Sequence, residues 1–175
     1  ALGRHARASL VALALLAASP PAFAQSGDKA AAESLFQIGK ALMSEGKHAQ
    51  ACPKFAESQR LDPSVGTLLN LARCYEAQGK TASAWAEFKA AAVLARTTGQ
   101  ADRETAAKQF AKELEPKLSK LQIDAPSPVA GLALTRDGAP FGMGSLGIPI
   151  AIDPGEHVIE ASAPGFTTWT SKVVV

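Results

Sequence analysis

Cys52 and Cys74 are the only thiols in this 175-residue chain and have its most distinctive chemistry. They lie 22 positions apart, so they cannot form the C-x-x-C pair of a thiol–disulfide oxidoreductase. In an oxidising compartment an even number of cysteines favours a disulfide, which would stabilise the fold by roughly 3 kcal/mol. The alternative is two unpaired thiols buried as small apolar side chains. We favour the disulfide.

The other residue types that perform chemistry are scattered. His48 and His157 lie in different halves of the chain, and we expect both to be exposed polar side chains rather than metal ligands. The sequence contains neither the G-x-S-x-G elbow of serine hydrolases nor a phosphate-binding G-x-x-x-x-G-K loop. We therefore predict no catalytic, metal-binding or cofactor-binding residues, and a protein that is not an enzyme.

Residues 1–24 have the three parts of a secretory signal peptide. Arg4 contributes to a basic start, residues 8–18 form an uncharged apolar run, and residues 22–24 place alanine at positions −3 and −1. We expect cleavage before Gln25 and a periplasmic or secreted protein. The apolar run is much shorter than the roughly 20 residues that span a bilayer, so we expect no transmembrane segment in the mature chain.

The charges balance after this leader. All 16 acidic residues and 16 of the 18 lysines and arginines lie in residues 25–175, so the mature net charge is close to zero. Nucleic-acid binding requires a concentrated basic face, and the sequence shows none. We therefore expect no nucleic-acid partner.

Much of the first half of the chain repeats after 33 residues. Gly46, Ala51 and Phe55 recur as Gly79, Ala84 and Phe88. Such a period, built on small and aromatic residues, is typical of stacked helical hairpins in which a glycine allows the turn. Residues 27–119 thus predict two hairpins and a capping helix over about residues 100–119, kinked or restarted at Pro116. Domain swapping or dimerisation would also cover the open end of so short a stack.

From Leu121 the apolar pattern changes to a period of two. The alternating residues are Leu121 and Ile123, then Leu132 and Leu134, then Ile148, Ile150 and Ile152. Turn signals separate the segments, at residues 137–138, 153–155 and 164–165. Residues 120–175 therefore predict a small antiparallel β-sandwich-like domain, and the fold class is α+β. We expect Trp85 and Trp169 to be core anchors. Because Val175 lies in an apparent strand, we expect the β-domain to be truncated there.

The repeated unit resembles the tetratricopeptide-repeat (TPR) family over about residues 32–98. The family's small and aromatic positions are occupied by Leu35, Ile38-Gly39, Leu42, Ala51, Phe55 and Pro63, and then by Leu68, Leu71-Ala72, Tyr75, Ala84, Phe88 and Ala91. This repeat order places Cys52 and Cys74 on neighbouring helices.

The TPR resemblance implies a concave groove, lined by the first helix of each hairpin, that binds a partner protein or peptide. The residues that it places in the groove are Phe36, Gln37, Lys40, Met43, Leu69, Asn70 and Arg73. Asn70 occupies a position where the family often holds a peptide backbone, and Lys40 and Arg73 would meet a carboxylate. The alternative is that these side chains form an ordinary solvated helix face.

The C-terminal part resembles the PEGA-type β-modules, which are named for a motif near a Pro-Gly turn. The resemblance is carried by residues 136–138, 147–150, 153–159 and 163–166. It implies an accessory domain of surface-layer or envelope proteins.

Together these features predict an exported, non-enzymatic adaptor or scaffold protein of the bacterial cell envelope. Two alternatives stay open. One is a cell-wall or polysaccharide-binding module that uses Phe166 and Trp169 of the β-domain, and the other is a structural subunit of an envelope assembly.

Overall fold

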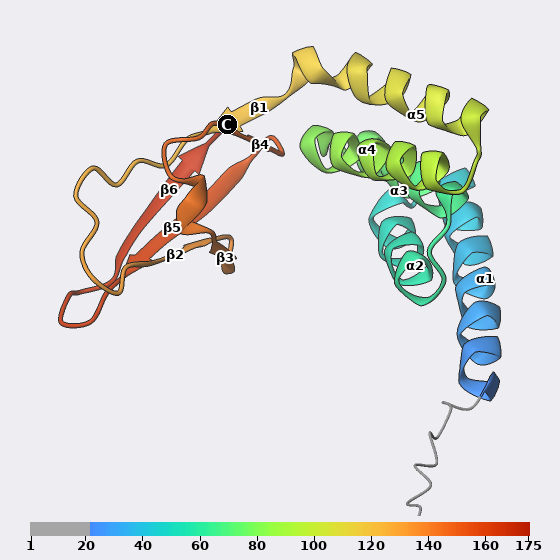
Figure 1. The fold of residues 1–175 in the computed structure, drawn as a ribbon, viewed down its shortest axis with the longest axis horizontal. Coiled ribbons are helices and arrows are strands. Elements are labelled where there is room, and N and C mark those ends of the chain that lie inside the picture. Colours follow the sequence, from blue (N-terminus) through green and yellow to red (C-terminus); the bar gives the residue numbers. More distant parts are fainter. Residues whose placement is uncertain (1–21) are drawn as a thin grey trace, which may run out of the picture.

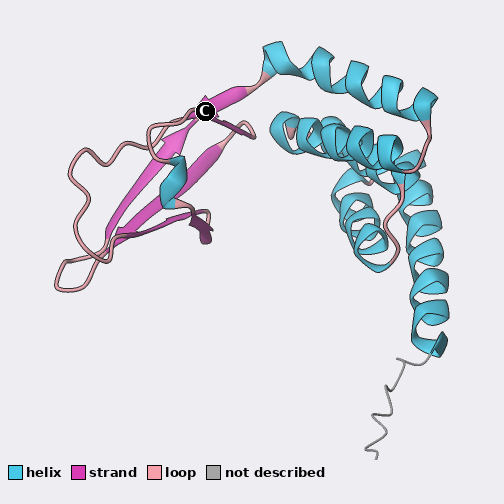
Figure 2. Ribbon diagram, in the orientation of Figure 1, coloured by secondary structure: helices cyan, strands magenta, loops and turns pink. Residues whose placement is uncertain are grey.

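The computed structural model describes residues 22–175, with the helices first along the chain and the strands after them (Figure 1). This order confirms the predicted α+β class. Figure 2 shows that the α-helices and the strands gather in two separate regions, which we call the helical region and the β-region; one 3-10 turn, η2 (Met143–Ser145), lies among the strands. Most of the predicted signal peptide, residues 1–21, lies outside the described residues, and the first helix begins at Ala22.

The described helical region consists of five α-helices, each packed against the next one along the chain. They are α1 (Ala22–Ser44), α2 (His48–Leu61), α3 (Val65–Ala77), α4 (Thr81–Thr97) and α5 (Ala101–Leu114). The predicted fifth helix is shorter than expected, because a 3-10 turn, η1 (Glu115–Lys117), takes over at Pro116. Proline has no N–H to continue the helical hydrogen bonds, so the restart at this position has a local cause.

Glycines end three of these helices in the same way. Gly46, Gly79 and Gly99 have φ values of 71°, 73° and 70°, in the left-handed region that favours glycine. The residue after each glycine donates its N–H to the carbonyl five residues earlier, as Lys47 does to Leu42 at 2.9 Å. The sequence identified the first two of these turns.

Two aromatic rings at equivalent repeat positions form the centres of the helical core. Phe55 packs with Ala51 and Leu71, and joins the first hairpin to α3. Phe88 packs with small residues of α3 and α4 and with Ala111 and Leu114 of α5. The last helix therefore covers the second hairpin in the way that α3 covers the first.

A disulfide lies inside the first of these clusters. The sulfur atoms of Cys52 on α2 and Cys74 on α3 are bonded at 2.14 Å, as the sequence analysis favoured. The bridge ties the first hairpin to the second. It suits an oxidising compartment, where such bonds persist.

The β-region contains two antiparallel sheets. Strands β1 (Ser119–Leu121) and β4 (Ile150–Ile152) form a two-stranded sheet. The four-stranded sheet has the order β3-β2-β5-β6, with β2 (Ala133–Arg136), β3 (Ala139–Phe141), β5 (Glu156–Ser162) and β6 (Trp169–Val174). Leu121, Ile152 and Ile159 join the two sheets in one apolar cluster.

Two of the predicted details of the β-region are wrong. Ile148 lies outside the strands and is exposed, because β4 begins only at Ile150. Trp169, expected as a core anchor, is 56% exposed at the start of the edge strand β6.

Among residues 22–175, no helix combines the length and apolar character needed to cross a bilayer.

Candidate functional site

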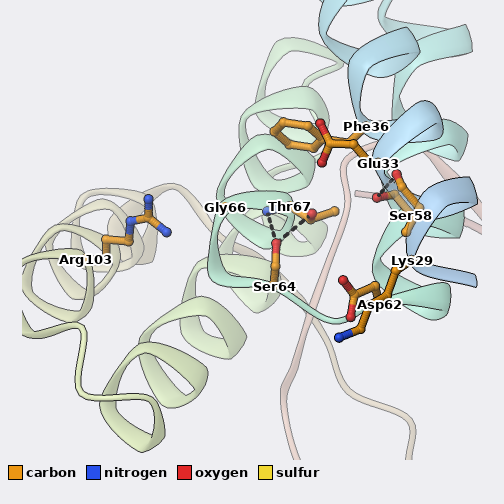
Figure 3. A pocket seen from close by; sticks show the side chains of 10 residues that line it. Lys29, Glu33, Phe36, Ser58, Asp62, Ser64, Gly66, Thr67 and Arg103 are labelled. Atoms are coloured by element: carbon orange, nitrogen blue, oxygen red, sulfur yellow. Dashed lines mark hydrogen bonds between the residues drawn. The ribbon is translucent and has the colours of Figure 1, made fainter. Parts of the chain in front are cut away.

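A shallow hollow of about 280 Å³ lies where α1, α3 and α5 approach one another (Figure 3). It is lined by Lys29, Ala32, Glu33, Phe36, Ser58, Asp62, Ser64, Gly66, Thr67 and Arg103. Arg103 reaches it from α5, on the side opposite Lys29 and Asp62. The hollow is therefore assembled from four helices, α1, α2, α3 and α5, and the loop between α2 and α3, and both signs of charge border it.

The hydroxyl groups of this hollow already have structural partners. Ser58, which is buried, donates to the carbonyl of Ala32 at 2.8 Å and so fastens α2 to α1. The Ser64 side chain accepts the N–H of Thr67 at 3.0 Å and caps the start of α3. The groups in the hollow best suited to a ligand are therefore its charged side chains.

Of the four predicted groove residues on α1, two pack against the core and two lie at the surface. Phe36 lines the hollow and meets the Phe55 ring edge-on, with 5.7 Å between the ring centroids. Met43 packs half-buried against the same cluster. Gln37 donates to Glu33 at 2.7 Å, and the Lys40 Nζ lies 5.7 Å from the Phe36 ring centroid.

The predicted groove residues of α3 are also partly committed to the fold. Leu69 packs half-buried against the alanine-rich core. Asn70 donates its amide to the carbonyl of Gly66 at 2.8 Å, so one of its donors is already used within α3. Arg73 lies over the Phe110 ring, at 4.0 Å from its centroid, and pairs with Glu76 at 3.1 Å.

The repeat pattern in the sequence does not predict that α5 lies beside the groove residues of α1 and α3. Phe110 supports the guanidinium of Arg73, and Arg103 borders the hollow, yet neither was assigned a role in binding. The apolar stripe that contains Phe110 indicated only packing. Of the seven predicted groove residues, only Phe36 lines the hollow itself.

A second polar constellation joins the helical region to the β-region. The Asp153 carboxylate accepts the backbone N–H of Ser83 at 2.8 Å and the hydroxyl of Ser83 at 2.5 Å. Ser83 lies in the first turn of α4, whose own N-cap residue, Lys80, provides no side-chain cap. A carboxylate at this position satisfies a free N–H and interacts favourably with the helix dipole. We call the group Ser83, Asp153, His157 and Asp137 the joint.

His157 completes the joint from within the β-region. Its Nδ1 lies 2.7 Å from the Asp137 carboxylate, and its Nε2 lies 2.8 Å from the carbonyl oxygen of Asp153. Both partners are acceptors, so the protonated ring, in which both nitrogens donate, satisfies both of them. The hydrogen bond to Asp137 raises the pKa of His157 above its ordinary value, and the bond from His157 lowers the pKa of Asp137. The expectation of an exposed His157 is wrong, since its side chain is only 12% exposed.

The joint contains serine, histidine and aspartate but lacks the geometry of a hydrolytic triad. In a triad the histidine accepts the proton of the serine hydroxyl. Here the Ser83 hydroxyl donates to Asp153, and both nitrogens of His157 face other oxygen atoms. The joint is therefore built to hold two parts of the chain together.

We expect the free energy of unfolding to fall as the pH rises from about 5.5 to about 8.5. Because the pKa of His157 is raised above 6.5, the stabilisation is complete below pH 6.5 and is lost as the pH passes the folded-state value. The pKa of Asp137 is lowered below 3.8, so its contribution is present above pH 3.8 and is lost under more acidic conditions.

Urea unfolding at these two pH values measures the effect. We expect about 1 kcal/mol or less, because the solvent screens the partly exposed Asp137. The His157→Gln variant should show a flatter pH profile between these values. An unchanged slope in this variant would assign the pH dependence to other groups.

Comparisons with models of known protein families and with curated proteins find no match to this chain.

Proposed function

We propose that the mature chain is an exported, non-enzymatic interaction protein of the bacterial envelope, whose helical region binds an extended acidic segment of a partner protein. The support for export is the leader-like start of the sequence together with a disulfide that suits an oxidising compartment. The PEGA-type resemblance of the β-region favours the envelope.

The proposal rests on two exposed cations, one on the first helix of each hairpin. Each of them lies over an aromatic ring. Lys40 lies over Phe36, and Arg73 lies over Phe110. Cation–π contacts restrict such side chains before a ligand arrives, which lowers the entropy that binding must remove. The Arg73 side chain remains 49% exposed and retains donors for a carboxylate.

The arrangement of the helices adds a second line of support. In the TPR family, which the repeat resembles, the first helix of each hairpin faces the bound segment. Here α1, α3 and α5 meet around the hollow, and Arg103 adds a cation from α5. An extended acidic segment along this face would pass the hollow and the two supported cations.

We expect the double variant Lys40→Ala/Arg73→Ala to capture its partner from envelope extract at least tenfold less well than the unaltered chain. Each charge-assisted hydrogen bond is worth about 1.5–3 kcal/mol, so two lost contacts exceed that factor. Quantitative mass spectrometry of matched pull-downs measures the ratio for every captured protein.

The matched control removes the same number of cations from second helices. Lys54→Ala/Arg96→Ala changes one residue on α2 and one on α4, so it reproduces the change in net charge away from this face. The proposal requires the control to capture as the unaltered chain does. Equal capture by both double variants would contradict it, and so would a partner whose bound segment lacks carboxylates.

A further inference from the structure

Two segments of the β-region lack charged side chains and lie together in the sheet. Residues 125–135 and 161–171 contain no lysine, arginine, aspartate, glutamate or histidine, and no asparagine or glutamine. These two uncharged segments, which we call the tip, are neighbours in the sheet, because Ala133 pairs with Ser162 and Ala161 pairs with Trp169. Asp153, Arg136 and His157 lie toward the opposite end, beside α4.

Large apolar side chains stand out from the tip. Phe166 is 64% exposed and Trp169 is 56% exposed, and Val129 is exposed as well. In Figure 1 the turn between β5 and β6 and the loop before β2 lie together at the end of the β-region farthest from the helices. The tip is therefore a projecting, apolar and uncharged surface.

The interior behind the tip is apolar too. A cavity of about 380 Å³ is bordered by Leu132, Ala161 and Trp169, and a smaller one of about 150 Å³ shares these residues and reaches Phe166. The exposed rings are therefore continuous with an apolar interior. Gln122 and Asp124 border the larger cavity and hydrogen-bond to each other at 3.0 Å; the other polar groups there are backbone groups and the hydroxyls of serine and threonine.

We propose that the tip binds the surface of a phospholipid bilayer, with Phe166 and Trp169 inserted at the level of the headgroups. Tryptophan favours this depth because it has an apolar ring and one N–H donor. A projecting apolar tip enters a fluid bilayer without requiring a complementary cavity. Uncharged loops also avoid the desolvation cost that buried charges would impose.

Two other partners fit the tip less well. Sugar sites place aromatic rings beside amide or charged side chains that fix the hydroxyls. The amide and the carboxylate that border the Trp169 cavity, Gln122 and Asp124, already hydrogen-bond to each other at 3.0 Å. Protein interfaces are enriched in arginine, whereas the charged side chains that border the tip are two carboxylates, those of Asp124 and Glu160. A lipid surface needs neither feature.

The orientation of the tip depends on the joint. Asp153 holds the charged end of the β-region on the start of α4, so the tip points away from the helices. If the tip binds a membrane, the side of the helical region formed by α1, α3 and α5 therefore stays open to a protein partner. The proposal does not rest on the proposed function, and Lys40→Ala/Arg73→Ala should bind vesicles as the unaltered chain does.

The test uses the fluorescence of a single tryptophan in the otherwise complete chain. Trp85→Phe leaves Trp169 as the only tryptophan, and Trp169→Phe leaves only the half-buried Trp85. Vesicles of palmitoyl-oleoyl phosphatidylcholine should shift the Trp169 emission to the blue. The same lipid brominated in its acyl chains should quench Trp169 and leave Trp85 unquenched. High salt should leave both effects unchanged, because no ion pair is involved.

Sedimentation with the same vesicles tests the side chains by a second route. Phe166→Ser should weaken the apparent affinity by about tenfold, from the loss of one large apolar contact. The double variant Phe166→Ser/Trp169→Ser should retain only the vesicle binding that other parts of the chain provide. The matched control is Val174→Ser, an exposed apolar residue on β6 at the end opposite Trp169, and it should bind normally.

Four outcomes would overturn the proposal. Sedimentation with Trp169 unquenched would assign binding to another part of the chain, the leader segment included. Binding that requires anionic lipid and is lost in high salt would assign it to a basic surface. A Trp169 response to purified cell-wall polysaccharide, and none to vesicles, would make the tip a sugar site. Equal vesicle binding by Phe166→Ser, Phe166→Ser/Trp169→Ser and Val174→Ser would remove the tip from the interaction.

Discussion

Replacing Phe55 with alanine should lower the free energy of unfolding by about 3–5 kcal/mol, the range observed when a buried aromatic ring is removed. The Phe55 side chain is fully buried and contacts residues of α1, α2 and α3. No single helix can move into the vacated space without losing contact with another. Urea or guanidinium unfolding followed by far-UV circular dichroism measures the change.

Gly39→Ala tests how closely α1 packs against the Phe55 ring, because it adds a methyl group instead of removing a ring. A Cβ atom at Gly39 would lie 2.8–3.0 Å from three atoms of the Phe55 ring, which is closer than carbon atoms pack. We expect a loss of about 1–3 kcal/mol from overpacking, larger than the gain of about 1 kcal/mol that alanine brings to a helix. The second repeat already has an alanine, Ala72, at the equivalent position.

The two sites should be coupled. Gly39→Ala combined with Phe55→Leu should cost less than the two single changes together, because the smaller side chain leaves room for the methyl group. Phe36→Ala is the control for Phe55→Ala, since removal of the half-buried Phe36 ring should cost less stability than removal of the Phe55 ring. A stability gain in Gly39→Ala would contradict the contact that the structure shows.

Removing the disulfide should cost about 3 kcal/mol, the value expected for a loop of this length. The sequence separation of Cys52 and Cys74 is 22 residues, and the bond restricts the unfolded chain across the boundary between the two hairpins. The double variant Cys52→Ala/Cys74→Ala and the reduced form of the natural chain should show similar midpoints in denaturant. Both measurements follow the helical signal.

Two controls make this prediction specific. The unreduced, denatured protein should show no reactive thiol, and reducing agent should leave the stability of the double alanine variant unchanged. Two reactive thiols before reduction would contradict the bond. A double alanine variant as stable as the oxidised protein would show instead that packing in this cluster, rather than the crosslink, holds the hairpins together.

Local sequence patterns predicted the hairpins, the turns and the strands of this protein. The 33-residue repeat predicted the hairpins, because apolar residues on one helical face and small residues at close contacts recur with the period of the structure. Glycine at positions 46 and 79 predicted the turns, because positive φ is a property of a single residue. The change to a period of two located the strands for the same local reason.

Contacts between residues that are far apart in the sequence depend on how the elements pack together. Asp153 caps α4 at Ser83, which lies 70 residues earlier, and no periodic pattern links the two positions. Arg73 is supported by Phe110 of α5, whose apolar spacing indicated packing and not its partner. Trp169 and His157 show the limit clearly: the tryptophan was expected inside and is exposed, whereas the histidine was expected outside and is enclosed. Burial of a side chain depends on the elements packed around it, and strand order and helix docking set those neighbours through contacts that local sequence does not encode.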